Sequence, residues 1–280
     1  MLYLFLAVLC TASISILMKL SGKYSENEFG LFLFNYSVCS IGAFLMMPKG
    51  QPLSSPGMLI VLVLGIFTGI LFVAGFFLIK KNMILNGLVM TSIFNKLNVL
   101  GPVLTAVLFF RETPTAVQLA GLFLCVTAIV LMNQNNASEG KKTEKNARWL
   151  LILLLTGAAS ESLVVVYNKV GTDALKDCYI FVTFFTAFLI SCVLTLKEHK
   201  KIELATVVFG ILVGIPNLFC TKCLLLAMQS IPASVVYPVF SAGGIAITTL
   251  FGLLVLKEKM NQRKAIGVAM LLAAIVLLNI

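Results

Sequence analysis

Ten long apolar runs follow one another along the chain, and only short polar stretches separate them. A helix that crosses the ~30 Å hydrocarbon core of a bilayer needs about 20 such residues. Hydrophobic residues make up 60% of the 280 residues and charged residues 11%, and a soluble protein of this length cannot bury that much apolar surface. The sequence predicts an all-α integral membrane protein with ten transmembrane helices, at residues 2–20, 30–47, 58–79, 87–110, 116–133, 149–168, 179–196, 204–228, 233–256 and 263–279.

The same composition excludes several other classes of protein. Disordered, collagen-like and disulfide-rich chains all require less apolar sequence, and the seven cysteines lie mostly inside apolar runs. The net charge of +10 comes from lysines and arginines in loops, which is typical of membrane proteins and does not indicate nucleic acid. The single histidine, His199, lies in a lysine-rich loop. We therefore expect the lipid bilayer as the surroundings, with no nucleic acid, no metal and no cofactor.

The ten apolar runs form two sets of five, because the second half of the sequence repeats the pattern of the first. When the second half is shifted back by 146 positions, Glu112 aligns with Glu258, Gly121 with Gly267 and Asn133 with Asn279, without a gap. Chance similarity between leucine-rich helices is the alternative, but it would not place three different residue types in one register. We interpret residues 1–133 and 147–280 as two five-helix repeats, joined by a polar linker at 134–146.

Five is an odd number, so two copies in one chain must lie upside down relative to each other. Inverted repeats are a design of secondary transporters, with the substrate site near the middle of the membrane at the repeat interface. Fifteen lysines and arginines follow odd-numbered spans and four follow even-numbered spans. This bias predicts odd-numbered loops in the cytoplasm and both termini outside, in a multi-pass protein of the cell membrane, of the bacterial inner or plasma membrane type.

Two matching blocks carry a resemblance to a known family: LFFRETPTAVQLAGLFLCVTAIVLMN from Leu108 and LLVLKEKMNQRKAIGVAMLLAAIVLLN from Leu253. Each has a short basic–acidic turn and then a helix with a glycine nine residues after the glutamate. In this the chain resembles an EamA-type, ten-span member of the drug/metabolite transporter superfamily. The first span departs from many members, because residues 11–15 (TASIS) stand where a Trp-Gly pair is common. The resemblance implies a central cavity lined by spans 1, 3, 4, 6, 8 and 9, and transport of a small organic solute without ATP hydrolysis.

Three ionisable residues lie inside spans. A charge at the bilayer centre costs about 2.5–3.5 kcal/mol on insertion scales, which makes each of them a candidate functional group. Other polar residues recur at helical spacing on three spans and are predicted to face the same cavity. The predicted substrate-binding set is Lys96, Glu161, Lys222, Thr91, Asn95, Asn98, Asn217, Thr221, Tyr237 and Ser241.

Each of these polar residues also has a purely structural interpretation. Hydroxyl and amide side chains hold transmembrane helices together, at about 0.6 kcal/mol apiece. The pairs Gly65/Gly69 and Gly210/Gly214 are predicted to be sites of close helix packing rather than of substrate contact. Glu161 is predicted to couple proton movement to substrate movement, and the alternative is a permanent ion pair with Lys96 or Lys222.

The favoured function is a secondary transporter of a small polar organic solute. Two intramembrane lysines against one carboxylate favour amino acids or related carboxylated solutes, with protons as a candidate coupling ion. The alternatives are a lipid-carrier or head-group translocator of the same fold, and an exporter of cations or drugs. A membrane enzyme or a receptor is a further class, but the sequence contains no catalytic set and no output domain.

Overall fold

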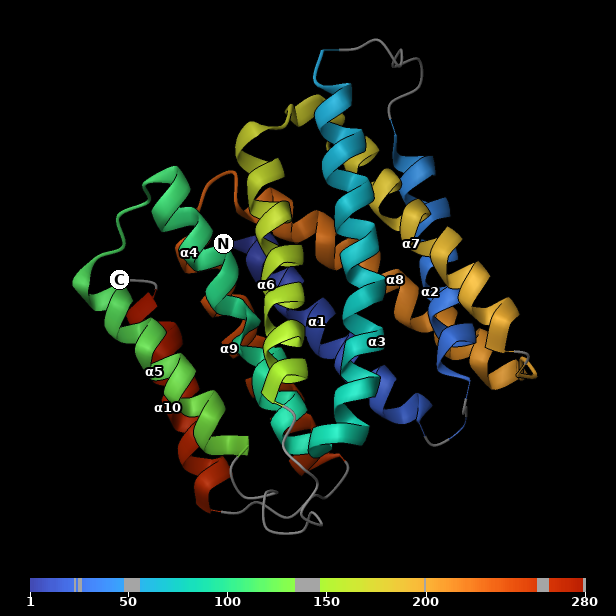
Figure 1. Cartoon of the computed structure of the whole chain (residues 1–280). Helices are drawn as coiled ribbons and strands as arrows, with labels where there is room; N and C mark the ends of the chain where they lie inside the picture. The colour runs from blue at the N-terminus through green and yellow to red at the C-terminus, as the bar shows by residue number, and fades with distance from the viewer. Residues whose placement is uncertain are drawn as a thin grey trace. The chain divides into compact units, whose positions relative to one another are not determined.

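The computed structural model describes residues 1–22, 24, 27–47, 56–133, 147–198, 200–255 and 262–278, and every regular element within these ranges is a helix (Figure 1). The elements are α1 (Leu2–Ser21), α2 (Glu28–Met46), α3 (Met58–Lys96), η1 (Leu97–Val99), α4 (Leu100–Phe110), α5 (Ala116–Asn133), α6 (Ala147–Val170), η3 (Asp173–Leu175), α7 (Lys176–Glu198), α8 (Leu204–Ala227), α9 (Ala233–Leu254) and α10 (Gln262–Leu278).

The helices have the surface of a membrane protein. Among the described residues, eight helical segments are long and apolar enough to cross a bilayer, and residues 116–131 and 265–278 form two shorter apolar helices. Each of the α-helices exposes large hydrophobic side chains, such as Leu59 at 73% and Phe109 at 78% exposure. Water would penalise such a surface, whereas lipid accommodates it. The predicted all-helical membrane fold is confirmed, and the count of ten spans stays a prediction.

One predicted boundary is wrong. The sequence predicts a loop between spans at residues 80–86, but α3 runs through this segment without interruption and bends in its C-terminal part (Figure 1). The segment contains neither glycine nor proline, so nothing in its local chemistry breaks the helix. Lys80 and Lys81, which were counted as loop charges, belong to a helix.

Contacts with α6 support this continuous helix. The Asn82 amide donates to the carbonyl of Leu78, one turn earlier, and to the carbonyl of Trp149, both at 2.9 Å. The Lys81 ammonium lies 3.2 Å from the centre of the Trp149 ring, which is a cation–π contact. The polar side chains of Lys81 and Asn82, which are typical of a loop, therefore find their partners on the neighbouring helix α6.

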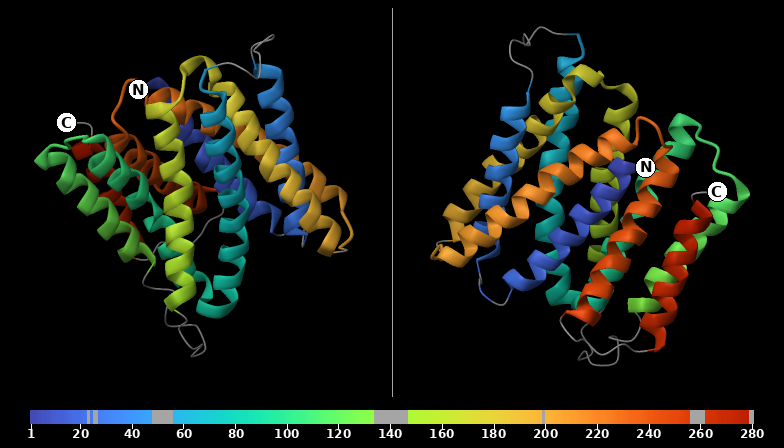
Figure 2. Two further views of the ribbon diagram at one scale, coloured as in Figure 1. Left: turned by 45° about the horizontal axis from the view of Figure 1, so that its top comes forward. Right: turned by 180° about the vertical axis from the view of Figure 1, so that it is seen from behind.

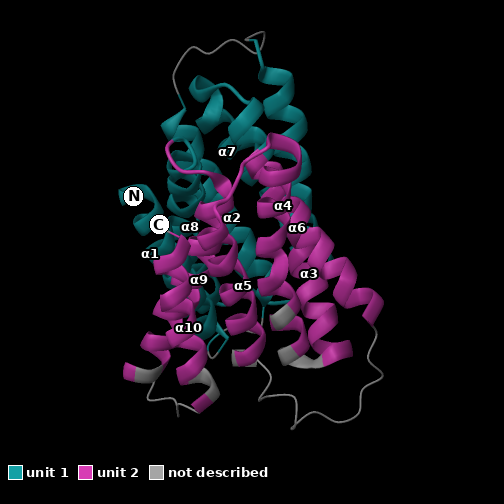
Figure 3. Cartoon of the chain, turned by 90° about the vertical axis from the view of Figure 1, so that its left-hand side faces the viewer, with its two compact units in different colours: residues 1–73, 166–229 teal, residues 74–165, 230–280 magenta. Residues whose placement is uncertain are grey.

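The chain forms two compact units, and neither of them coincides with a sequence half (Figure 3). Unit 1 is residues 1–73 and 166–229, and unit 2 is residues 74–165 and 230–280. Each unit therefore combines helices from both predicted repeats. The repeat boundaries at 1–133 and 147–280 stay a prediction, and the linker at 134–146 lies outside the described residues.

In unit 1, α2 packs against α7 and α8, and α1 runs beside α8 (Figure 2). The two glycine pairs create close approaches, as predicted: Gly65/Gly69 bring α3 against α7, and Gly210/Gly214 bring α8 against α2. A Cβ atom on Gly69 would lie 2.5 Å from the Thr183 carbonyl oxygen of α7, and one on Gly214 would lie 2.8 Å from the Asn35 carbonyl oxygen of α2. Only a residue without a side chain lets the backbones come this near.

In unit 2, small and branched side chains hold α5, α9 and α10 together, and α5 lies along α10 (Figure 2). The fully buried cluster at their junction consists of Cys125, Ala128, Ile129, Ala242, Leu271 and Ala274. Gly121 continues this contact, because a Cβ there would lie 3.2 Å from the Ala274 carbonyl oxygen. The volume of these residues sets the spacing of the helices.

The first turn of α9 is capped from another part of unit 2. Its N-cap residue, Pro232, has no side-chain hydrogen bond to offer. The Glu112 carboxylate, just beyond α4, instead accepts from the backbone N–H groups of Ala233 at 3.2 Å and Ser234 at 3.0 Å. A carboxylate at a helix N-terminus satisfies orphan donors and interacts favourably with the helix dipole. Glu112 therefore fixes where α9 begins.

The close approach at Gly69 is testable by adding a single methyl group. Gly69→Ala should lower the stability of the protein by about 1–3 kcal/mol, because the new Cβ cannot fit against the Thr183 carbonyl without moving α7. Thermal unfolding in detergent micelles measures the loss. Gly75→Ala is the matched control on the same helix, since no atom lies within 4 Å of its Cβ. An equal loss in both variants would contradict the packing argument.

Candidate functional site

Glu161 lies in the middle of α6, and α9 supplies its neighbour. The Tyr237 hydroxyl donates to the Glu161 backbone carbonyl at 3.2 Å and also interacts with the Glu161 carboxyl group. The Tyr237 side chain is buried, whereas Glu161 is half-buried. A carboxyl group held beside an aromatic hydroxyl inside a helical bundle can accept a proton or bind a cationic group.

The segment around η1 packs on the same face of α6. A Cβ on Gly157, one turn before Glu161, would lie 3.0 Å from the Cβ of Asn98, and one on Gly101 would lie 2.5 Å from the Cβ of Ala158. Further along α4, the Thr105 hydroxyl donates to the Ser162 hydroxyl at 2.8 Å. Asn98, Glu161 and Tyr237 are thus brought to adjoining parts of unit 2. Their role in substrate binding stays a prediction.

Four other predicted residues also belong to unit 2. Lys96 is the last residue of α3, two positions before Asn98, and its side chain is half-buried. Asn95 precedes it and is half-buried as well, while Thr91 is fully buried one turn earlier. Ser241 lies half-buried on α9, one turn after Tyr237. Lys96 and Glu161 therefore lie on segments that contact each other at Asn98 and Gly157.

The remaining predicted residues, Asn217, Thr221 and Lys222, lie on α8 in unit 1. The Asn217 amide donates to the Asn35 side-chain oxygen of α2 at 3.1 Å, and the Thr221 hydroxyl donates to the Asn217 carbonyl at 3.3 Å. These are the bonds of helix packing, next to the close approach at Gly214. Their role in substrate binding stays a prediction.

Lys222 has a partner that the sequence analysis did not assign. Its ammonium group lies 2.8 Å from the Asp177 carboxylate, at the start of α7, and 3.6 Å from the Met46 sulfur. Lys222 is therefore paired with Asp177 and not with Glu161, which was one of the pairs that the sequence allowed. Its positive charge is compensated by the Asp177 carboxylate. The reason is positional, since Lys222 and Asp177 lie near the adjoining ends of α8 and α7.

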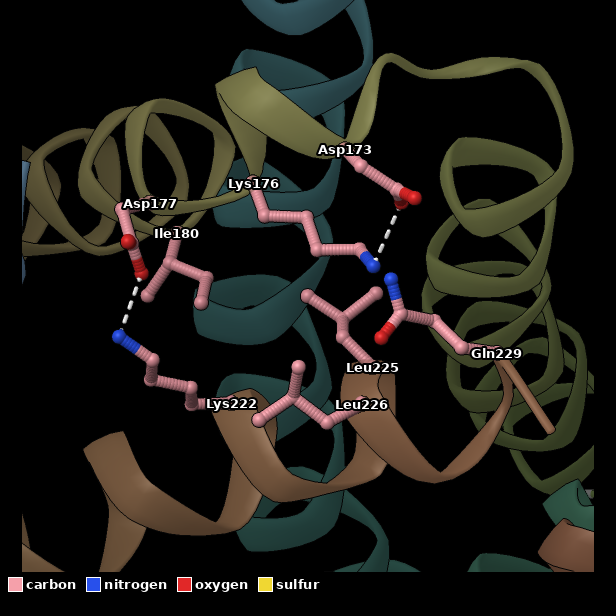
Figure 4. A pocket seen from close by; sticks show the side chains of 8 residues that line it. All are labelled: Asp173, Lys176, Asp177, Ile180, Lys222, Leu225, Leu226 and Gln229. Carbon is pink, nitrogen blue, oxygen red and sulfur yellow. Dashed lines mark ion pairs between the residues drawn. The ribbon is translucent and has the colours of Figure 1, made fainter. Parts of the chain in front are cut away.

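A pocket surrounds this ion pair in unit 1 (Figure 4). A second pair, Lys176–Asp173 at 2.7 Å, lies across it, and Gln229 follows α8. These residues are not in the predicted binding set, because the sequence predicts a loop and helix ends at their positions. The available signal was the spacing of Asp173, Lys176 and Asp177, since residues three and four apart lie on one face of a helix.

No group of three or more histidine, cysteine or acidic side chains within the described ranges could hold a metal ion. The charged and polar side chains are instead distributed along apolar, bilayer-length helices. This arrangement is that of a multi-pass membrane protein.

Comparisons with known proteins agree with this class. Residues 1–134 match the EamA-like transporter family, and residues 177–271 match the Small Multidrug Resistance protein family. Residues 1–134 are therefore an EamA-like domain, and the resemblance to the drug/metabolite transporter superfamily is confirmed. The family matches point to a transporter rather than an enzyme.

Individual relatives extend the comparison. A protein of Haemophilus influenzae, named only as uncharacterized, is 23% identical over 97% of this chain and 95% of its own length. The multidrug resistance protein EbrA of Bacillus licheniformis is 36% identical, and that of Bacillus subtilis 39% identical, over 20% and 19% of this chain. These two alignments span about half of each EbrA chain, 52% and 51%.

The fold is shared with a protein of known structure. A crystal structure matches over 100% of this chain and 97% of its own, with a TM-score of 0.75 and 17% sequence identity. At this identity the match supports the fold alone.

Proposed function

We propose that the protein is a secondary transporter that moves a small polar organic solute across the cell membrane, with Glu161 as its coupling residue. The observation that carries the proposal is the Glu161 carboxyl group in the middle of α6, held by the Tyr237 hydroxyl of α9. The other acidic residues within the described ranges lie at helix ends or between helices, namely Glu28, Glu112, Asp173, Asp177, Glu198 and Glu203. A lone carboxyl group at this depth is costly unless it serves a purpose.

The substrate we favour carries an amine, and amino acids are the first class to test. Glu161 offers a counter-charge for an ammonium group, and Lys96, on the contacting segment, offers one for a carboxylate. With Lys222 paired to Asp177, the basic excess that favoured purely anionic solutes is smaller than the sequence suggested. One positive and one negative group together suit a zwitterion.

Export of organic cations or drugs is the second candidate, because segments of the chain are similar to the multidrug resistance protein EbrA. Thermal-shift screening against amino acids, nucleosides, sugars and amines separates the two. Stabilisation by amino acids supports the first function, and stabilisation by lipophilic cations alone supports the second. Translocation of a lipid head group would instead require stabilisation by lipid.

The proposal includes two inverted five-helix repeats, residues 1–133 and 147–280. Reciprocal packing supports it: α3 uses Gly65 and Gly69 against α7, and its repeat equivalent α8 uses Gly210 and Gly214 against α2, the equivalent of α7. If a two-fold axis relates the repeats, it places α3 on α8 and α7 on α2, so that the α3–α7 contact and the α8–α2 contact are equivalent.

Reporter fusions test the inversion. A fluorescent protein fused after residue 133, behind five spans, should fold in the cytoplasm, whereas alkaline phosphatase fused after residue 280, behind ten spans, should be active outside. The exchanged fusions serve as controls and should be silent. If both positions report the same side of the membrane, the two repeats are not inverted.

If Glu161 couples proton movement to substrate movement, its replacement should abolish transport driven by a pH gradient. Glu161→Gln, which mimics a permanently protonated carboxyl group, should retain substrate binding and exchange but lose transport driven by a pH gradient in proteoliposomes. Glu203→Gln, at the exposed start of α8, is the control and should transport normally. Under a purely structural role the variant would instead be unstable, and unchanged gradient-driven transport would remove Glu161 from the mechanism.

Lys96 is predicted to hold the carboxylate of the substrate. Lys96→Ala should weaken the binding of amino acids about tenfold or more, since a charge-assisted hydrogen bond is worth about 1.5–3 kcal/mol, while the protein stays folded. Titration calorimetry measures the change, with Lys80→Ala on the same helix as the control. If only organic cations bind, and the variant binds them more tightly, the carboxylate assignment is wrong.

A further inference from the structure

The pocket in unit 1 contains two complete ion pairs on an apolar floor (Figure 4). Lys176 and Asp173 form one pair at 2.7 Å, and Lys222 and Asp177 form the other at 2.8 Å. The floor consists of Ile180, Leu225 and Leu226. With two positive and two negative groups, the pocket has no formal net charge.

The two partners in the first pair differ sharply in exposure. The Lys176 side chain is only 10% exposed, whereas that of Asp173 is 75% exposed. Beyond this ion pair, the described residues provide the Lys176 ammonium group with no hydrogen bond. A lysine has three N–H donors, so donors remain to be satisfied in a buried position. Asp173 can rotate into water at little cost, which would leave an anion-binding cation at the pocket wall.

The second pair is partly covered on both sides. The Lys222 and Asp177 side chains are 28% and 23% exposed, and they lie across the pocket from Lys176 (Figure 4). Gln229, which interacts with Asp173, adds an amide that can both donate and accept. The pocket therefore presents the anion-binding Lys176 at one side and the Asp177 carboxylate at the other (Figure 4).

We infer that this pocket binds a small zwitterion, whose anionic group takes the place of Asp173 at Lys176 and whose ammonium group is held by Asp177 or the released Asp173. A zwitterion gains two charge-assisted contacts in this pocket, one to Lys176 and one to a carboxylate, whereas a singly charged solute gains only one of them. The site lies in unit 1 and uses neither Glu161 nor Lys96, so it is additional to the proposed transport site.

The size of the pocket restricts the ligand. Its volume is about 150 Å³, the space of roughly five water molecules at ~30 Å³ each. A free amino acid such as alanine fits this volume, and so does the head group of a zwitterionic lipid whose tails stay in the bilayer. Both present an anionic group and an ammonium group, and the experiment distinguishes them.

The test uses the full chain with the Lys96→Ala substitution, which weakens amino-acid binding at the proposed transport site, purified in a maltoside detergent. Three probes of similar shape are compared. Titration calorimetry should show that alanine binds at least tenfold more tightly than propionate or ethylamine, which each carry one of its two charges. Phosphoethanolamine, and nanodiscs of phosphatidylethanolamine compared with phosphatidylglycerol, form the lipid arm. Binding of alanine identifies a free solute, and binding of phosphoethanolamine alone identifies a lipid head group. Binding of neither, or equal binding of all probes, overturns the inference.

Two variants assign the binding to this pocket. In the Lys96→Ala background, in which the proposed transport site binds amino acids weakly, Lys176→Met should reduce the remaining zwitterion binding at least tenfold. Lys169→Met, which removes an exposed lysine near the end of α6, should leave that binding unchanged. Asp173→Asn removes the competing carboxylate and should tighten propionate binding, a gain that misfolding cannot produce. Unchanged zwitterion binding in Lys176→Met, or no gain of propionate binding in Asp173→Asn, contradicts the assignment. These variants leave Glu161 in place, so pH-gradient-driven transport tests the proposed function separately from zwitterion binding in this pocket.

Discussion

Hydrocarbon offers no hydrogen bonds, so every polar group that enters the bilayer must find its partner within the protein. The asparagines show how the chain meets this constraint. Asn217 donates to Asn35 across α8 and α2, Asn82 donates to the Trp149 carbonyl across α3 and α6, and Asn168 donates to the Leu225 carbonyl of α8. Each bond joins two helices, and the position of each asparagine therefore determines which helices lie together.

The lipid environment also explains why the helices pack closely. Lipid tails are as apolar as leucine, so burial of apolar surface does not by itself bring transmembrane helices together. The helices of unit 1 instead meet where Gly69 and Gly214 bring one backbone against another. Beside the Gly69 contact, the Thr68 hydroxyl lies 3.0 Å from the Tyr179 hydroxyl, and the Tyr179 ring stacks on Tyr167 with 3.8 Å between ring centroids.

The distribution of charge separates two kinds of polar group. Lys176 and Lys222 each lie against an aspartate at the adjoining ends of α7 and α8, where two opposite charges offset one another. Glu161 lies deep in α6 beside a tyrosine hydroxyl, with a lysine on the contacting segment. A neutral set of ion pairs can exchange partners with a zwitterion, whereas a single deep carboxyl group can exchange a proton for a cation. These different chemistries underlie the two sites proposed for the protein.

Local sequence determined the features that depend on local physics. Apolar runs of bilayer length predicted the helices, and Ala116–Asn133 begins and ends at the predicted residues, because backbone hydrogen bonding in lipid leaves few alternatives to helix. Glycines four residues apart predicted close packing, because their lack of a side chain has the same effect in any fold.

Tertiary structure decided what depends on a partner from another part of the chain. Residues 80–86 continue a helix because Trp149 accepts from Asn82 and lies under Lys81, and Lys222 pairs with Asp177 because two helix ends adjoin. Glu112, which the sequence analysis used only to align the repeats, caps α9 through two backbone N–H groups. Polar side chains can bind many partners, and only the packing of the helices selects which partner is within reach.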